Sequence, residues 1–234
     1  MARAGKRYKS ILETVDREKI YDIEKAFELA RASAKAKFDE SIDIAVNLGV
    51  DPKHADQMIR GTVVLPNGIG KKVRVLAIAK GEKEREAKEA GADFIGGEDI
   101  IKKIQDGWLD FDRVVATPDM MSSVGKLGKI LGPRGLMPNP KTGTISFDIG
   151  RTVKEIKSGK IEFKVEKAGI VHCSVGKASF DVAKLVENFR AFINAVIRLK
   201  PASSKGKYIK KITVSSTMGV GVKIDTGQVM NIVK

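Results

Sequence analysis

The sequence predicts a mixed α/β protein with two domains, one inserted into the other. Alternating apolar and polar residues, typical of half-buried strands, occupy both the first and the last part of the chain. The stretch between them alternates short buried strands with helices, which is typical of a parallel sheet. Glycine and proline residues mark the two points of change, at 65–68 and 158–159.

The first part of the chain contains a predicted helix followed by a predicted strand. Asp22 is a suitable N-cap for a helix that places Ile23, Phe27 and Ala30 on one face. Apolar and polar residues alternate strictly between 41 and 48, so one side of this strand is expected to be buried. The segment 65–68, Leu-Pro-Asn-Gly, then ends the pattern.

The middle of the chain, residues 67–159, is predicted to be an inserted Rossmann-like α/β domain. We expect strands at 73–79, 94–95 and 113–116, and helices at 82–90, 99–105 and 120–130. Strands that alternate with helices imply parallel pairing with helical crossovers. The two connections, at 66–68 and 158–159, are expected to act together as a double hinge.

The last part of the chain returns to the antiparallel pattern. Residues 161–165 and 170–175 alternate around a turn at 167–169, which predicts a hairpin. Ser179 is expected to cap a helix whose apolar stripe extends from Val182 to Val196, and a final strand passes through Ile212 and Val214. Residues 1–66 and 160–234 together therefore form the predicted discontinuous α+β domain, of split β-α-β type.

Composition is typical of a folded protein that binds a polyanion. Of the 234 residues, 42% are hydrophobic, which is enough apolar material for a folded core. There are 43 basic and 29 acidic residues, and the net charge of +14 attracts nucleic acid first and an anionic membrane second. Residues 160–234 hold 14 basic and 5 acidic residues, so we expect the polyanion surface on the discontinuous domain.

Membrane attachment and metal binding find little support. The longest apolar run, near residues 73–79, is interrupted by Arg74 and is too short to span a bilayer, so no membrane partner is expected. The charged start of the chain does not resemble a secretory signal, and the single cysteine, Cys173, fits a reducing, cytoplasmic setting. His54 and His172 have no partner at zinc-ligand spacing, so no metal is expected.

A parallel α/β domain raises the alternative of a nucleotide-dependent enzyme. A dinucleotide site needs several glycines between strand and helix, whereas residues 81–84 are Gly-Glu-Lys-Glu, and their acids would repel phosphate. Ser122, Ser123 and Cys173 have no histidine at a motif distance, although sequence distance alone leaves spatial contact open. We therefore expect no cofactor and no catalysis, with the nucleotide-dependent enzyme kept as the alternative.

Two stretches carry side chains suited to RNA. No acidic residue lies between Met120 and Phe147, and the glycine- and proline-rich loop within this stretch carries four cations, namely Lys126, Lys129, Arg134 and Lys141. A rigid structural loop with ordinary surface lysines is the alternative. Further along, the strand with Ile212 and Val214 turned inward presents a polar ribbon of Lys211, Thr213, Ser215 and Thr217. A threonine-rich outer face is also common in any exposed strand.

Four motifs in this sequence resemble those of a known family. Residues 132–138, Gly-Pro-Arg-Gly-Leu-Met-Pro, resemble the signature of the L-one family of ribosomal proteins. The segments 36–41, 59–62 with 65–66, and 216–219 do so too, in the same order and spacing. The resemblance covers nearly the whole chain and is closest to the bacterial form.

The resemblance implies a structural, non-enzymatic constituent of the large ribosomal subunit in the cytoplasm. Its split domain would bind a folded site in large-subunit ribosomal RNA, on the mobile stalk near the exit site, and assist the release of deacylated transfer RNA. Its inserted Rossmann-like domain would bind no nucleotide. Many bacterial members also bind their own messenger RNA and repress its translation, and the sequence leaves the weight of the two roles open. We expect a monomer when the protein is free.

Carried over by motif, the resemblance also implies a set of RNA contacts: Lys37, Phe38, Glu40, Ser41, Thr217, Met218 and Gly219. Phe38 would stack on a base unless it is a core residue, and Gly219 would let the backbone approach ribose unless it only forms a bulge. Glu40 must accept a hydrogen bond from RNA or hold Lys37 in place. Secondary candidates are Lys167, Gly169 and His172, whereas residues 226–234 match no family motif.

Overall fold

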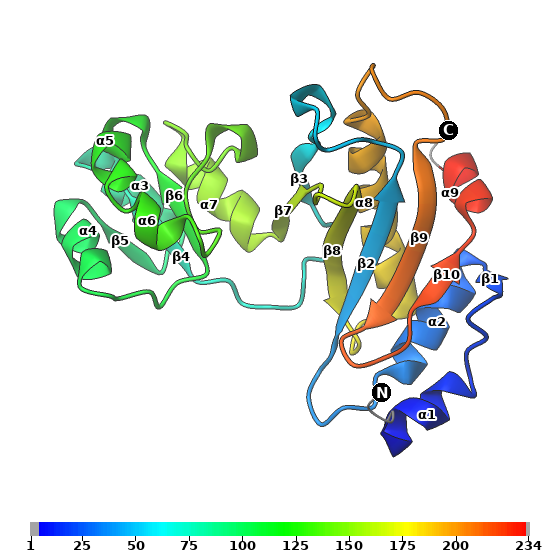
Figure 1. The fold of residues 1–234 in the computed structure, drawn as a ribbon. Helices are drawn as coiled ribbons and strands as arrows, with labels where there is room; N and C mark the ends of the chain where they lie inside the picture. Colours follow the sequence, from blue (N-terminus) through cyan, green and yellow to red (C-terminus); the bar gives the residue numbers. More distant parts are fainter. Residues whose placement is uncertain (1–4, 233–234) are drawn as a thin grey trace. The chain divides into compact units, whose positions relative to one another are not determined.

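The computed structural model describes residues 5–232, with side chains as far as Val229. The chain forms two compact units with mixed α/β structure (Figure 1). The split unit contains the chain up to Gly70 and from Glu162 onward, and the inserted unit contains Lys71–Ile161. These boundaries lie close to the predicted ones at 66/67 and 159/160. Residues 1–4 and 233–234 of the predicted discontinuous domain lie outside the described residues.

The split unit is built on a five-stranded sheet with the order β1-β10-β9-β2-β8. Strands β8 and β9 are both antiparallel to β2, which lies between them, and helix α8 connects them. This arrangement is a split β-α-β unit, as predicted. The strands are β1 (Ile20–Tyr21), β2 (Ser41–Leu48), β8 (Ile170–Lys177), β9 (Ile209–Ser216) and β10 (Val222–Ile224).

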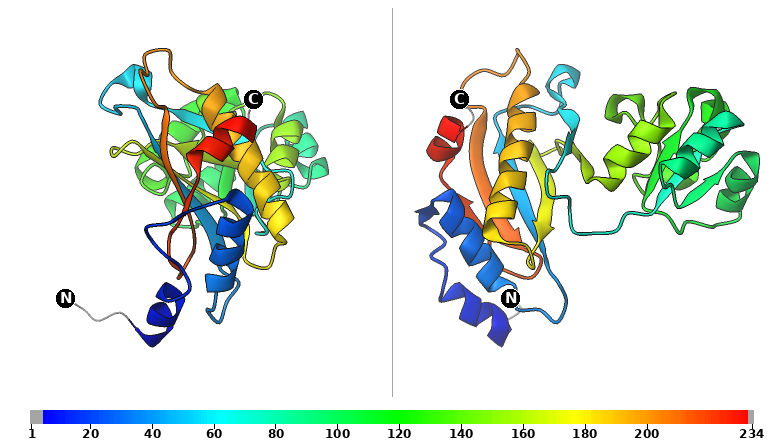
Figure 2. Two further views of the ribbon diagram at one scale, coloured as in Figure 1. Left: turned by 90° about the vertical axis from the view of Figure 1, so that its right-hand side faces the viewer. Right: turned by 180° about the vertical axis from the view of Figure 1, so that it is seen from behind.

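Two helices, α2 (Ile23–Ser33) and α8 (Val182–Arg198), cover one face of this sheet (Figure 2). The large apolar side chains of β2, from Ile42 to Leu48 at every second position, point toward these helices and are buried. The rings of Phe27 and Phe189 meet edge to face at 5.5 Å. Each large side chain buried in this way contributes about 1.5–3 kcal/mol to folding. The opposite face of the sheet is turned toward the viewer in Figure 1.

The helix caps follow the prediction at one position and differ at another. Asp22 is the N-cap of α2, and its carboxylate accepts a bond from Gln228 of α9 (Thr226–Ile232) at 2.7 Å. The N-cap of α8 is Asp181, so the prediction of Ser179 was wrong. Ser179 instead donates its N–H and its hydroxyl to the Asp39 carboxylate, at 3.1 and 2.8 Å. The structure also contains α1 (Lys6–Leu12) and a 3₁₀ turn, η1 (Ala55–Gln57), which we did not predict.

The predicted hairpin of residues 161–175 exists only at its turn. Strand β7 (Lys160–Lys164) pairs with β3 (Arg60–Val64) in a separate two-stranded sheet, whereas β8 pairs with β2. A single bridge joins Val165 to Val171. The reason lies in the packing of β7, because Phe163 is buried with its ring 5.3 Å from that of Phe192 in α8.

Residues 66–68, the first of the two predicted connections between the domains, are hydrogen-bonded to the split unit. The buried side chain of Asn188 accepts the Asn67 N–H at 3.0 Å and donates to the carbonyls of Gly68 and Val175, at 2.9 and 2.8 Å. A buried amide that satisfies three backbone groups holds them firmly, since leaving any of them unpaired is costly. The split unit therefore extends to Gly70, past the proline and glycine that we expected to mark its end.

The inserted unit contains a parallel three-stranded sheet with the order β5-β4-β6 and helices on both faces. Its strands are β4 (Val75–Ile78), β5 (Phe94–Gly96) and β6 (Arg113–Ala116). One face packs against α4 (Glu98–Gln105), α5 (Met121–Gly125) and α6 (Gly128–Leu131). The other packs against α3 (Glu82–Glu89) and α7 (Ile149–Lys157). Such a doubly covered sheet is the Rossmann-like arrangement that the alternation of strands and helices predicted.

Two parts of the inserted unit differ from the sequence prediction. The helix expected at 120–130 is divided into η2 (Pro118–Met120), α5 and α6, and the glycines at 125 and 128 explain the break, because glycine costs about 1 kcal/mol in a helix. Helix α7 was missed, although Asp148 caps it by accepting the Arg151 N–H at 3.1 Å. A further 3₁₀ turn, η3 (Pro140–Thr142), follows the basic loop.

Within the described residues, no helix is long and apolar enough to cross a membrane.

Candidate nucleic-acid interface

Two segments far apart in the sequence meet at one end of the central strand β2. The loop 34–40 leads into β2, and the turn 217–219 leaves β9, whose Ser216 lies opposite Ile42. The Thr217 N–H donates to the Ser41 carbonyl at 3.0 Å, and the Ser41 N–H donates to the Thr217 hydroxyl at 2.9 Å. Two of the four segments that carry the motifs thus form one continuous surface, which we call the loop surface (residues 34–41 and 217–219).

A buried carboxylate holds the loop surface together. Glu40 is 1% exposed, and its two oxygens accept the backbone N–H groups of Ala36 and Met218, each at 2.8 Å. Burial raises the pKa of Glu40, but the bonds from Met218 and Ala36, with smaller contributions from Ser216 and Arg7, bring that pKa below its ordinary value. Both Glu40 oxygens therefore bind the backbone of the protein, and the hydrogen bonds do not include the Lys37 side chain that we considered as a partner; contact between Glu40 and RNA stays a prediction. Glu40 is a positioning residue.

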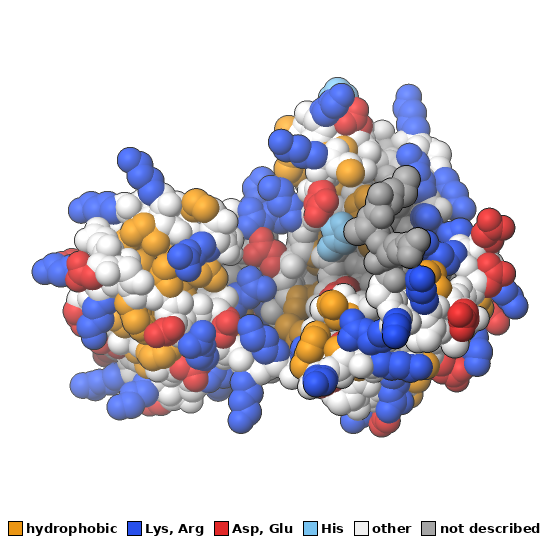
Figure 3. Space-filling model, turned by 60° about the horizontal axis from the view of Figure 1, so that its bottom comes forward, with side chains coloured by type: hydrophobic (Ala, Val, Ile, Leu, Met, Phe, Trp, Pro, Cys, Tyr) orange, Lys and Arg blue, Asp and Glu red, His pale blue; other side chains and the backbone are white. Residues whose placement is uncertain are grey.

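Two large apolar side chains stand exposed on the same surface. Phe38 is 56% exposed and Met218 is 47% exposed, and Lys37 is exposed beside Phe38. Phe38 is therefore not the core residue that we considered as its alternative. The view toward this end of the split unit shows apolar side chains beside lysine and arginine side chains (Figure 3). An exposed aromatic ring among cations suits the stacking of a base next to its phosphate.

Gly219 is explained by packing inside the turn. A Cβ atom at this position would overlap the hydroxyls of Ser216 and Ser33. Those two hydroxyls are buried and lie 3.2 Å apart, so they have little room to move. Glycine at this position therefore lets the turn lie close to Ser33 of α2. The predicted contact between Gly219 and ribose stays a prediction.

The open face of the five-stranded sheet continues from the loop surface. Strand register places Thr213 and His172 on either side of Ala45, and Ser215 and Ser174 on either side of Asp43, with Lys211 opposite Asn47. The predicted residues Lys211, Thr213, Ser215 and His172 therefore share one face. Burial raises the pKa of Asp43, although the nearby Ser174 hydroxyl and the charges of Lys177 and His172 act to lower it. A carboxylate at this place disfavours phosphate, so we expect sugar or base contacts on this part of the face.

The turn between β7 and β8 keeps two of its three candidates accessible. Lys167 is exposed, and exposed His172 lies 3.6 Å from the Glu166 carboxylate, measured from Nε2 to Oε1. Gly169 is buried at φ 76°, and its carbonyl accepts the Leu48 N–H at 2.9 Å. The positive φ therefore explains why this turn position holds a glycine, and contact between Gly169 and RNA stays a prediction.

Lys177 is a member of this region that sequence reasoning missed. Its ammonium group donates to the Ser41 hydroxyl at 3.0 Å and to the Asp39 carbonyl at 3.3 Å. It therefore fixes the start of β2 from the neighbouring strand β8. Only the pairing of β8 with β2 reveals this role, because Lys177 and Ser41 are far apart in the sequence.

The second group of predicted cations lies on the inserted unit. All four side chains are exposed, and the buried residues Val124, Leu127 and Leu131 anchor the segment that carries them. The Asn139 side chain accepts the Lys141 N–H at 2.8 Å and fixes the end of the loop. The loop is thus both an ordered structural element and a cationic surface. The cations are Lys126, Lys129, Arg134 and Lys141.

Comparison with known proteins identifies the family. The model of the Ribosomal protein L1p/L10e family matches residues 30–220, which include the loop surface and the whole inserted unit. The chain belongs to this family. A large ribosomal subunit protein uL1 from Solidesulfovibrio magneticus is 56% identical over 234 residues, and one from Syntrophobacter fumaroxidans is 58% identical over 233 residues. Both alignments cover the whole of each chain.

Membership in the L1p/L10e family decides between the two classes of function considered above. The family consists of ribosomal proteins, so the prediction of a non-enzymatic protein is confirmed. The nucleotide-dependent enzyme, which we kept as the alternative, is set aside.

Proposed function

We propose that the protein is a structural component of the large ribosomal subunit that binds large-subunit ribosomal RNA through the loop surface. The RNA site is the folded stalk near the exit site. The observation that carries the proposal is the exposure of Phe38 and Met218 on a surface that the buried Glu40 carboxylate holds in place. Family membership and the names of the two relatives support the ribosomal setting.

Each part of the loop surface has a distinct role in this proposal. The Phe38 ring stacks on an unpaired base, and such stacking contributes about 1–3 kcal/mol. Met218 fills an apolar gap beside it, and Lys37 contacts phosphate. The hydroxyls of Thr213 and Ser215 contact ribose on the open face of the sheet, with Lys211, Ser41, Lys167 and His172 at its margins. Specificity comes from the shape of the folded RNA, because the apolar and hydroxyl groups are held in fixed positions.

The wider role follows from the setting of the RNA site. On the cytoplasmic ribosome, a protein bound to a mobile stalk near the exit site assists the release of deacylated transfer RNA. The cations of the inserted unit, on the loop 125–141, contact that transfer RNA or nearby ribosomal RNA. The protein also represses its own synthesis by binding a similar fold in its messenger RNA, and it is a monomer without cofactor when free. Ribosomal and messenger RNA would compete, because they use the same surface.

Charging the loop surface tests the proposal. Phe38→Asp is expected to weaken binding to a stalk-like ribosomal RNA fragment about 10- to 100-fold, because a carboxylate loses the stacking and repels phosphate. Phe147→Asp is the matched control, since Phe147 is 63% exposed on the inserted unit. Both variants should melt within a few degrees of the unmodified protein. Equal RNA affinities of the two variants would contradict the proposed surface.

A further inference from the structure

A second cationic segment lies outside the loop surface. Residues 198–211 contain six basic and no acidic residues, and all six basic side chains are exposed. Within the described part of the chain, none of the six forms a salt bridge with a carboxylate; they are Arg198, Lys200, Lys205, Lys207, Lys210 and Lys211. This segment, which joins α8 to β9, is called the lysine segment below.

The lysine segment is fastened to the end of β2. The Gly49 N–H donates to the Tyr208 carbonyl at 2.6 Å, and the Ser204 hydroxyl donates to the Gly49 carbonyl at 3.1 Å. Tyr208 is buried and its hydroxyl donates to the Val196 carbonyl at 3.0 Å. The backbone at Lys207 lies so close to Gly49 that a Cβ atom there would overlap the Lys207 carbonyl. The cations therefore stand on an anchored backbone.

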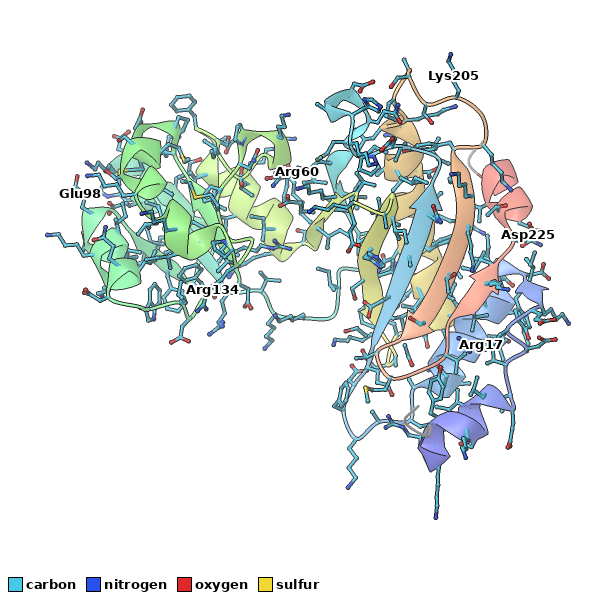
Figure 4. All side chains as sticks on the ribbon, viewed as in Figure 1. Arg17, Arg60, Glu98, Arg134, Lys205 and Asp225 are labelled. Carbon is cyan, nitrogen blue, oxygen red and sulfur yellow. The ribbon has the colours of Figure 1, made fainter. Side chains whose placement is uncertain are left out.

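The lysine segment and the loop surface lie at opposite ends of the same strand. Strand β2 starts at Ser41, beside the loop surface, and ends at Leu48, next to Gly49. Eight residues of strand span about 26 Å, since each residue advances the chain by about 3.3 Å. Figure 4 shows Lys205 at the end of the split unit away from the loop surface. Lys37 and Lys205 therefore cannot contact the same phosphate, whereas Lys211 lies opposite Asn47 on the open face and belongs to the margin of both surfaces.

Nearby acidic residues do not cancel the charge of the lysine segment. Asp51 and Asp225 each accept a local backbone N–H, from Lys53 at 3.0 Å and from Gly227 at 2.8 Å. A hydrogen bond from Ser203 is the main reason that the pKa of Asp56 is lowered. The three carboxylates are outnumbered by seven cations, namely the six of the lysine segment and Lys53, which is also exposed. The region therefore keeps a net positive charge.

We propose that the lysine segment is a second RNA-binding site, which holds the ribose-phosphate backbone by charge without selecting bases. Lysine ammonium groups bind phosphate as point charges and carry no information on sequence. The aromatic ring of the segment, Tyr208, is buried and so is not available for stacking. The inference rests on the proposed function only in taking RNA as the ligand. Its consequence is that one RNA, or two parts of one folded RNA, is held at both ends of β2.

The salt dependence of binding tests this site. Each phosphate neutralised on single-stranded RNA contributes about −0.7 to the slope of log K against log salt. Replacement of Arg198, Lys205 and Lys210 by glutamine should therefore flatten that slope by about 2 for polyuridylate. The control replaces Lys25, Lys184 and Arg190 on the helical face by glutamine, with the same loss of charge and an expected change of less than about 0.5. Equal slopes for the two triple variants would overturn the proposal.

Cross-linking places the RNA directly and separates the two surfaces. Burial raises the pKa of Cys173, the single cysteine, to about 12, so a new exposed cysteine can be labelled selectively at neutral pH. A photo-cross-linker on Lys205→Cys should capture the RNA that co-purifies with the protein, and one on Lys184→Cys should not. Met218→Cys reports on the loop surface. Cross-links from Met218→Cys alone would refute the second site, and cross-links from Lys205→Cys alone would refute the proposed function.

Discussion

The Met218 N–H donates to the Glu40 carboxylate at 2.8 Å, and the other oxygen of the same carboxylate accepts the Ala36 N–H. One buried charge thereby joins the segment before β2 to the turn after β9. Both of these partners are backbone N–H groups, so the two bonds fix backbone and leave the Phe38 and Met218 side chains available. Rigid support of this kind lowers the ordering cost of binding.

Glu40→Gln should weaken both folding and RNA binding. The amide nitrogen of glutamine cannot accept an N–H bond, so one backbone N–H group loses its partner, which costs about 1–3 kcal/mol in free energy of unfolding. Denaturant unfolding and RNA titration measure the two effects. Glu24→Gln is the control, because Glu24 is exposed in the first turn of α2, on the helical side of the sheet. A Glu40→Gln protein that folds and binds like this control would contradict the positioning role.

Gly219→Ala should displace the turn that carries Met218. The new methyl group would overlap two buried hydroxyls, and such overpacking typically costs about 1–3 kcal/mol. RNA affinity should fall with it, since Met218 moves. Gly128→Ala in α6 is the matched control, because no atom lies within 4 Å of a Cβ there. Thermal melts that show the same small change for both variants would show that the turn is loosely packed.

Thr217→Ala should lower stability slightly and RNA affinity more. The Thr217 hydroxyl accepts the Ser41 N–H at 2.9 Å and lies 3.3 Å from the Ser41 carbonyl, so its loss costs about 0.5–1.5 kcal/mol. Thr217→Ser keeps the hydroxyl and should restore both properties. If the serine variant remained as weak as the alanine variant, the methyl group, and not the hydroxyl, would carry the effect.

The inserted unit should lose stability between about pH 4 and pH 2. A backbone bond from Arg74, together with Lys71, lowers the pKa of Asp112 from 3.8 to about 2. A pKa that is lower in the folded state stabilises the fold above the unfolded pKa, and this contribution disappears as the pH falls through the folded pKa. Asp112→Asn should be less stable at pH 7 and less sensitive to acid in this window.

Trp108 provides the measurement, because its ring lies 4.8 Å from that of Phe94 inside the same unit. Denaturant unfolding curves followed by its fluorescence at pH 7, 4 and 2 give the free energy at each pH. An Asp112→Asn protein with the same acid sensitivity as the unmodified protein would show that other carboxylates dominate.

The spacing of apolar residues along the sequence predicted those helices and strands in which the apolar positions are also the buried positions. The strict alternation of 41–48 and the stripe of Val182 to Val196 became β2 and α8, because each places a continuous apolar face on the core. The prediction of a hairpin at 161–175 failed because Phe163 packs against Phe192. These residues are far apart in the sequence, and the alternation of apolar and polar residues does not reveal such a contact.

The sequence indicated which segments make up the candidate site, but not which of their side chains face inward and which face solvent. The motifs at 36–41 and 216–219 indicated two segments far apart in the sequence, and the structure shows that they meet. They did not distinguish Glu40, which faces inward, from Phe38, which faces solvent, because that difference depends on the N–H groups of Met218 and Ala36. The sequence also did not show that Gly169 adopts a positive φ, which is a requirement of the turn itself.

The most direct test is to sequence the RNA that co-purifies with the protein and with the double variant Phe38→Asp, Met218→Asp. The unmodified protein should retain a stalk-like segment of large-subunit ribosomal RNA together with the matching segment of its own messenger RNA. The double variant should lose both while it still folds. Random RNA with the unmodified protein, or the same two segments with the variant, would contradict the account.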